Sequence, residues 1–172
     1  EAEKWMRERN YFGLMMVNTG EADAMVTGHS RSYPSTIKPV MQLIDKAPGV
    51  SKIATTNMMM TARGPIFLSD TAINPNPSAD DLARIALMTA KTVRMFGMEP
   101  VIAMVSYSNF GSSHNEGPSK VSQAVAYLHE NFPDLIVDGE IQTDFALNSD
   151  MLKSKFPFSK LVNKKVNTLI FP

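Results

Sequence analysis

The sequence predicts an α/β fold with a mostly parallel sheet and one antiparallel hairpin. Short apolar runs alternate with longer segments in which apolar residues recur at helical spacing, as strands and helices do in such folds. Two of the runs, 52–56 and 65–68, lie too close in sequence for a helical crossover, which needs a dozen or more residues. We therefore expect these two runs to pair as a hairpin around residues 61–64.

The N-terminal part of the chain predicts two helices separated by a short strand. The expected elements are a helix at 1–19, a buried strand at 22–26, a polar loop at 27–32 and a helix at 35–44. Gly20 breaks the first helix, and Ser35 is the expected cap of the second. Pro39 is tolerated there only near the first turn, because proline lacks an N–H. The turn 46–49, which contains Pro48 and Gly49, is the candidate domain boundary.

The remainder of the chain continues the alternation after the hairpin. Further strands are expected at 101–105, 135–137 and 167–171, and helices at 78–95, 120–132 and 149–155. The helix behind Ser78 has the clearest signals, because Asp80 and Asp81 lie where the helix dipole favours carboxylates and Gly97 can end it. The segment 138–140 is expected to be a polar loop.

Composition excludes several classes of partner. Lysine plus arginine and aspartate plus glutamate both total 17, whereas nucleic acids and anionic membranes usually select a basic excess. No apolar run approaches the roughly 20 residues that span a bilayer. The chain has no cysteine, which excludes disulfides and zinc–thiolate sites and agrees with a reducing, cytoplasmic location. We expect a small-molecule ligand, with no nucleic acid and no membrane as partner.

The polar loop after the strand at 101–105 is one candidate ligand site. Loops at the carboxyl ends of strands hold ligands in open α/β sheets, and glycine lets a ligand approach the backbone. The candidate groups in this loop are Ser106, Ser108, Asn109, Gly111, Ser112 and Ser113. The alternative is an ordinary connection whose polar residues only form turns.

A second candidate lies around the predicted start of the helix at 35–44. Arg31 and Lys38 bracket that start, and two cations beside free backbone N–H groups can hold a phosphate. Surface cations beside a helix start are also common without a ligand. The same polar segment contributes Thr27, Gly28 and Ser30.

The sequence offers little evidence for a metal site. The three histidines, at 29, 114 and 129, have no metal-binding spacing, and no nucleotide-binding glycine motif is present. Asp70, Asp138 and Asp144 follow predicted strands and could gather around Mg²⁺, although isolated aspartates at strand ends more often accept hydrogen bonds in turns. We expect no metal ion bound by this chain.

Several sequence blocks together resemble the phosphate acetyltransferase family. In order, they are EADAMVTG (21–28), STIKP (35–39), SDTAINPNP (69–77), FGMEP (96–100), DLIVDG (134–139) and LIFP (169–172). Two more blocks, YFGLMMV (11–17) and SYSNFGSS (106–113), are similar to the version of this domain fused behind the dehydrogenase of large bacterial malic enzymes. The blocks follow the order of the family and cover nearly the whole chain.

The resemblance implies a two-lobed, three-layer α/β/α fold like that of the isocitrate and isopropylmalate dehydrogenases. Residues 1–47 would end the first lobe, and residues 48–172 would form most of the second, which also dimerises in this family. CoA and phosphoryl groups would meet between the lobes, where residues 27–38 would face residues 106–113 with Asp70 and Asn74 nearby. The catalytic serine–arginine pair of the family follows its LIFP block, so no catalytic residue is assigned and the 172-residue chain alone is expected to lack acetyltransferase activity.

Two positions depart from the family pattern. Lys38 stands where the family typically has arginine, and it keeps the charge without the bidentate geometry. Thr71 replaces a frequent cysteine. We expect a regulatory domain that senses acetyl-CoA in an NADP-dependent malic enzyme, whose NADP and divalent metal would bind only outside this chain. The alternative is part of an active phosphate acetyltransferase.

Overall fold

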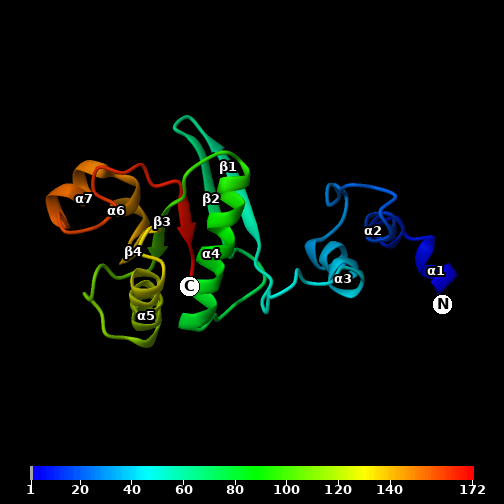
Figure 1. Cartoon of the computed structure of the whole chain (residues 1–172), viewed down its shortest axis with the longest axis horizontal. Coiled ribbons are helices and arrows are strands. Elements are labelled where there is room, and N and C mark those ends of the chain that lie inside the picture. Colours follow the sequence, from blue (N-terminus) through cyan, green and yellow to red (C-terminus); the bar gives the residue numbers. More distant parts are fainter. Residues whose placement is uncertain (1) are drawn as a thin grey trace. The chain divides into compact units, whose positions relative to one another are not determined.

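The computed structural model describes residues 2–172, which form two compact units divided after Ser51. Unit 1, which ends at Ser51, contains three helices, α1 (Ala2–Met6), α2 (Arg9–Thr19) and α3 (Tyr33–Leu43) (Figure 1). Unit 2, Lys52–Pro172, contains the sheet and the remaining helices. The turn predicted at 46–49 is present, with the Val50 N–H donating to the Ala47 carbonyl at 3.0 Å.

The single helix predicted at 1–19 is divided in two. Glu8 has an extended conformation, and its carboxylate accepts the N–H groups of Asn10 and Tyr11 at 3.0 and 3.3 Å. A side chain that caps in this way satisfies N–H groups at the start of a helix, so a new helix begins at Arg9.

The start of α3 was also predicted wrongly. The helix begins at Tyr33 with Ser32 as the N-cap residue, and the hydroxyl of Ser35 donates to the Ser32 carbonyl instead of capping. Pro34 occupies the first turn, where its missing N–H costs little. Pro39 lies inside the helix, so the Ser35 carbonyl has no N–H four residues ahead.

The strand predicted at 22–26 does not exist. The segment is irregular, and Val26 is 99% exposed. An apolar run forms a buried strand only where another strand pairs with it, and unit 1 contains no strand within the part of the chain that the structure describes.

Unit 2 is built on a five-stranded sheet in the order β1-β2-β5-β3-β4. The strands are β1 (Thr56–Thr61), β2 (Gly64–Ser69), β3 (Val101–Val105), β4 (Ile136–Ile141) and β5 (Thr168–Ile170). Only β1 and β2 pair antiparallel, which confirms the predicted sheet and its hairpin. The first hairpin strand begins at Thr56, four residues later than predicted, and it contains the methionines 58–60.

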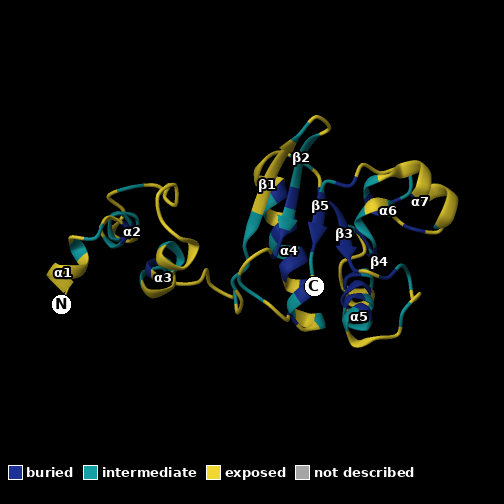
Figure 2. Cartoon of the chain, turned by 180° about the vertical axis from the view of Figure 1, so that it is seen from behind, coloured by how far each residue is buried: buried dark blue, intermediate teal, exposed yellow. Residues whose placement is uncertain are grey.

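Helices cover both faces of the sheet. Helices α4 (Ala79–Met95) and α5 (Glu116–Asn131) pack with Ile102 and Met104 of β3 on one face. Helices α6 (Thr143–Leu147) and α7 (Ser149–Lys155) pack with Val101, Ala103 and Val105 on the other. Alternate residues of one strand thus contribute to two apolar clusters, and β3, β5 and the inner sides of α4 and α5 are buried (Figure 2).

The segment 138–140, predicted as a loop, lies inside β4. The pairing of β3 with β4 shifts at this point, because Met104 pairs with Gly139 and Val105 pairs with Ile141. Glu140 is therefore an extra residue, as in a β-bulge. Gly139 has a φ of 148°, and a Cβ there would meet the Met104 backbone, so only glycine fits.

The helix signals behind Ser78 are confirmed. The Ser78 hydroxyl accepts the Asp81 N–H at 3.2 Å, and the Asp81 carboxylate accepts the Ser78 N–H at 3.2 Å, which forms a reciprocal capping box. Helix α5 begins at Glu116, earlier than predicted, with Pro118 in its first turn, and α6 was not predicted. None of the helices within residues 2–172 has both the length and the apolar character needed to cross a membrane.

Candidate functional site at the carboxyl edge of the sheet

Polar side chains from three connections lie at one edge of the sheet in unit 2. Strands β2, β5, β3 and β4 run parallel, so their carboxyl ends meet at the same edge. The Asp70 turn follows β2, the loop 106–115 follows β3, and Gln142 follows β4. The predicted site residues of unit 2 all lie in the first two of these connections: Asp70, Asn74, Ser106, Ser108, Asn109, Gly111, Ser112 and Ser113.

Asp70 organises the turn after β2. Its carboxylate accepts the Thr55 hydroxyl at 2.5 Å, the Thr55 N–H at 3.0 Å, and the backbone and side-chain N–H groups of Asn74 at 2.8 and 2.6 Å. Burial raises the pKa of Asp70, but the hydrogen bonds from Thr55 and Asn74 outweigh it and lower the pKa to about 2. Asp70 therefore holds the turn as a carboxylate, and its oxygens are already occupied.

Glu140 anchors the loop after β3 from beneath. It is 1% exposed, and its carboxylate accepts the Ser108 hydroxyl at 3.0 Å, the Gly111 N–H at 2.6 Å and the Ser122 hydroxyl of α5 in a short hydrogen bond. Burial raises the pKa of Glu140, and the hydrogen bonds, that of Ser122 first, bring the pKa below its ordinary value. A buried and fully hydrogen-bonded carboxylate positions a loop and is poorly suited to act as a base.

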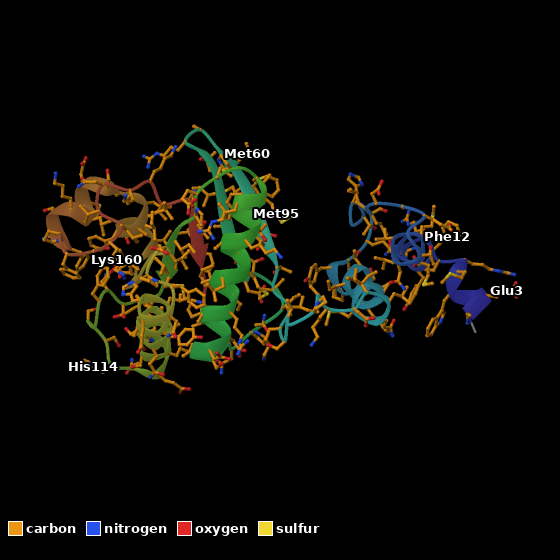
Figure 3. All side chains as sticks on the ribbon, viewed as in Figure 1. Glu3, Phe12, Met60, Met95, His114 and Lys160 are labelled. Atoms are coloured by element: carbon orange, nitrogen blue, oxygen red, sulfur yellow. The ribbon has the colours of Figure 1, made fainter. Side chains whose placement is uncertain are left out.

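Most of the predicted ligand donors of this loop are used within it. Ser112 shares a hydrogen bond of 2.9 Å with Ser108, and the Asn109 amide exchanges two hydrogen bonds with Gln142, at 2.7 and 2.8 Å. Within residues 2–172 the Ser113 hydroxyl makes one long hydrogen bond, in which it accepts the Asn115 N–H at 3.4 Å. The outer part of the loop, which carries the exposed His114, therefore offers more open donors than the inner part (Figure 3).

Sequence reasoning did not identify Glu140, Ser122, Gln142 or Thr55 as members of these networks. The available signal was a pair of acidic residues, Asp138 and Glu140, that interrupts an apolar run. A buried charge requires partners, and such a run therefore indicates a strand with a polar network as well as a loop.

Asp138 also has a structural partner. Its carboxylate accepts the Ser159 hydroxyl and the Lys160 N–H, both at 2.7 Å. Asp70, Asp138 and Asp144 do not form a magnesium site, and no group of three acidic, histidine or cysteine side chains within residues 2–172 could hold a metal ion.

The predicted site residues of unit 1 lie on the segment between α2 and α3. The Thr27 hydroxyl donates to Asn10 at 2.8 Å, and Ser30 accepts a hydrogen bond from Arg9 at 2.9 Å. Asn10 is 1% exposed, and its amide nitrogen has no hydrogen-bond partner within residues 2–172. Gly28 has a φ of 114°, which permits the turn between these contacts.

The two cations among the predicted site residues of unit 1, Arg31 and Lys38, differ in how they are held. Arg31 forms an ion pair of 2.9 Å with Glu8, and both side chains are partly exposed. A guanidinium has five N–H donors, so this pair leaves most of them available. Lys38 lies on α3, is exposed, and forms no ion pair within residues 2–172. This segment therefore offers positive charge for an anion.

Comparisons with known proteins agree with the fold and with the sequence blocks. A phosphate acetyltransferase from Synechocystis is 40% identical over 163 residues, which are 95% of this chain and 23% of that protein. An NADP-dependent malic enzyme from Escherichia coli is 39% identical over 160 residues, or 93% of this chain and 21% of the enzyme. A phosphotransacetylase structure from Streptococcus pyogenes has a TM-score of 0.85 and 38% identity, and the match covers 99% of this chain and 52% of that one.

This chain thus spans about half the length of the solved structure and less than a quarter of the two longer relatives. The family description "phosphate acetyl/butaryl transferase" matches residues 1–172. The chain belongs to the phosphate acetyl/butaryl transferase family.

Proposed function

We propose that the chain is part of a phosphate acetyltransferase, which exchanges an acetyl group between phosphate and CoA. The observation that carries this proposal is the match to acetyltransferases along the whole chain. A Bacillus subtilis phosphate acetyltransferase, for example, is 37% identical over 172 residues, so no part of the chain lies outside the match. This was the alternative in the sequence analysis, and the names of the relatives favour it over the regulatory domain expected there.

In the proposed reaction, the sulfur of CoA forms a bond to the acetyl carbon of acetyl phosphate, and the bond from that carbon to the phosphate oxygen breaks. Phosphate leaves with the electron pair, and the thiol proton is lost to a base that we do not assign within this chain. The contribution of this chain is to bind the anionic groups. Arg31 and Lys38 supply positive charge for those groups.

We further propose that the loop 106–113 contributes polar contacts to the CoA thioester. Glu140 holds its inner side, so the contacts would come from the outer residues such as Ser113. The Asp70 turn would act mainly by fixing Asn74, whose amide nitrogen is already bound to the Ile53 carbonyl and to Asp70.

The test is an assay of the complete protein for acetyl-CoA formation from acetyl phosphate and CoA. Arg31→Ala and Lys38→Ala should each raise the KM for acetyl phosphate about tenfold or more, the typical effect of losing a charge-assisted contact. Arg7→Ala is the control, since Arg7 forms an exposed ion pair with Glu3 on α1. Unchanged KM values for both variants would place the phosphate site elsewhere.

A second candidate function is regulation of an NADP-dependent malic enzyme by acetyl-CoA. The E. coli malic enzyme is about as similar to this chain as the acetyltransferases are, which is the observation in favour of it. In that case malate-dependent reduction of NADP by the complete protein should respond to acetyl-CoA. The response should require a higher concentration of acetyl-CoA in Arg31→Ala and be unchanged in Arg7→Ala. A protein with acetyltransferase activity and no malate oxidation would exclude this candidate.

We also propose that unit 2 self-associates. Met58, Met59 and Met60 of the edge strand β1 are 44%, 50% and 71% exposed, and Met95 at the end of α4 is 78% exposed. Met60 and Met95 both project near the hairpin end of unit 2 (Figure 3), and exposed apolar patches often mark interfaces. Sedimentation of the unmodified chain should show at least a dimer. Met59→Lys should weaken this dimer, whereas Met41→Lys, in unit 1, should leave it unchanged. A single 19.0 kDa species for the unmodified chain would contradict this.

A further inference from the structure

A cavity of about 820 Å³ lies in unit 2, away from the edge that carries Asp70 and the loop 106–113. It is bounded by the turn between β1 and β2, by α6, and by residues 163–166, which precede β5. Because β2 and β5 are parallel, the start of β2 and the approach to β5 lie at the amino edge of the sheet, opposite the candidate site (Figure 1). The volume falls within the range of small-molecule sites, roughly 300–1,000 Å³.

The lining combines apolar walls with an excess of positive charge. Pro65, Ile66, Leu147 and Val166 provide apolar surface, and the only charged residues of the lining are the three cations Arg63, Lys164 and Lys165. None of these cations is in an ion pair with a carboxylate of residues 2–172. A neutral chain thus concentrates unpaired positive charge around one apolar cavity.

Two of the cations are held in place by the backbone around the cavity. Arg63 donates from Nη1 to the Leu147 carbonyl at 3.2 Å, which joins the hairpin turn to the end of α6. The Lys165 ammonium donates to the Arg63 carbonyl in a short hydrogen bond. The contact of Arg63 is with the carboxyl end of α6, where cations are favoured, whereas that of Lys165 is with the hairpin turn. They use one N–H of each and leave the other donors open.

Lys164 has no such structural role, because no hydrogen bond or ion pair of its ammonium is present among residues 2–172. The residue before it, Asn163, has a φ of 60°, in the left-handed region that asparagine tolerates better than most residues. Asn163 is the first of four successive residues, 163–166, that line the cavity.

We propose that this cavity binds a small organic anion with an apolar body, such as an aromatic or aliphatic carboxylate, sulfonate or phosphate. The apolar walls would receive the body of the ligand, and Lys164, with the open donors of Arg63 and Lys165, would bind its anionic group. The charge of the lining favours this ligand over a neutral apolar molecule. The site is independent of the proposed acyl transfer, which concerns the opposite edge of the sheet.

The test uses two fluorescent probes that differ by one charged group. The probe 8-anilinonaphthalene-1-sulfonate is an anion with an apolar body, and N-phenyl-1-naphthylamine has the same body without the sulfonate. We expect the anion to bind the folded protein about tenfold more tightly than the neutral probe, and Lys164→Ala to weaken binding of the anion about tenfold. Lys164→Arg should retain most of the affinity, and the affinity for the neutral probe should not change with either variant.

Lys160→Ala is the matched control, because Lys160 is exposed, lies four residues before Lys164 and does not line the cavity. Leu147→Ala should weaken the binding of both probes, because Leu147 would contact the apolar body that they share. Near-ultraviolet circular dichroism verifies that each variant is folded. Equal affinity for the two probes, or equal losses in Lys160→Ala and Lys164→Ala, would overturn the proposal. So would a change in sedimentation of Lys164→Ala, since the face would then be occupied by a second copy of the chain.

Discussion

Two buried carboxylates, Asp70 and Glu140, hold the connections at the carboxyl edge of the sheet. Each accepts hydrogen bonds from at least one residue distant in sequence, and each has a pKa below its ordinary value. Their role is to fix the backbone around the candidate site.

Asp70→Asn should destabilise unit 2 by about 2 kcal/mol at pH 7. The folded-state pKa of Asp70 is about 2 against an ordinary 3.8, so its stabilising effect is present above about pH 4 and is lost as the pH falls toward 2. Denaturant unfolding at pH 7 and at pH 2.5 measures this difference. The free energy of unfolding should fall less between these pH values in Asp70→Asn than in the unmodified protein, whereas Asp134→Asn, at an exposed position, should follow the unmodified protein.

Glu140→Gln should loosen the loop after β3. An amide can accept at one oxygen only, so at least one of the donors from Ser108, Gly111 and Ser122 loses its acceptor, at a cost of about 2 kcal/mol. Hydrogen exchange at the Gly111 amide should become faster. The control Glu130→Gln changes an exposed carboxylate on α5, and equal exchange rates in the two variants would argue against Glu140 as the anchor of the loop.

At the scale of single elements, α4 and α5 begin in chemically different ways. Ser78 caps α4 through its hydroxyl, whereas Asn115 at the start of α5 makes no side-chain hydrogen bond to the helix and donates to the Tyr107 hydroxyl instead. Ser78→Ala should therefore lower the free energy of unfolding by about 1 kcal/mol. Asn115→Ala should lower the free energy of unfolding by less. If thermal unfolding shows equal losses of stability in the two variants, the reciprocal cap of Ser78 and Asp81 contributes nothing.

The elements that the sequence predicted correctly are those whose signals are local. The helix behind Ser78 and the apolar strand at 101–105 carry their own caps or continuous apolar character, and both are present. The predictions at 22–26 and 138–140 failed because burial depends on distant partners. Val26 has no strand to pair with, whereas the buried Asp138 is satisfied by Ser159, far along the chain.

For the candidate site, the sequence predicts the position in the fold but not how its polar side chains are used. Its position after β3 follows from the order of elements, which the sequence predicts. The sequence does not predict that the hydroxyl groups of Ser108 and Ser112 are hydrogen-bonded to each other and, through Ser108, to Glu140. That network depends on the bulge in β4, where Glu140 is the extra residue, and on donors from Ser108 and Ser122, which are distant in sequence.

For unit 2 as a whole, the sheet has two parts that are continuous in sequence. The hairpin of β1 and β2 is one, and β3, α5 and β4 form the other. The three residues of β5 lie between them and pair with both β2 and β3. Thr168 and Leu169 are buried in this position, although the strand is the shortest of the sheet.

The central strand of the sheet, β5, is thus the one that follows the other four in the sequence. Among the five described strands β5 is synthesised last, so β2 and β3 each emerge with one unpaired edge that remains open until residue 170 is available. On a stalled ribosome, nascent chains should resist protease only when the chain through Pro172 has left the exit tunnel, and Leu169→Pro should abolish this protection because proline cannot join a central strand. Before β5 is available, the nascent chain exposes two unpaired strand edges, and such edges make partly folded chains prone to aggregate. We therefore expect its need for a chaperone to be greatest at this stage of synthesis.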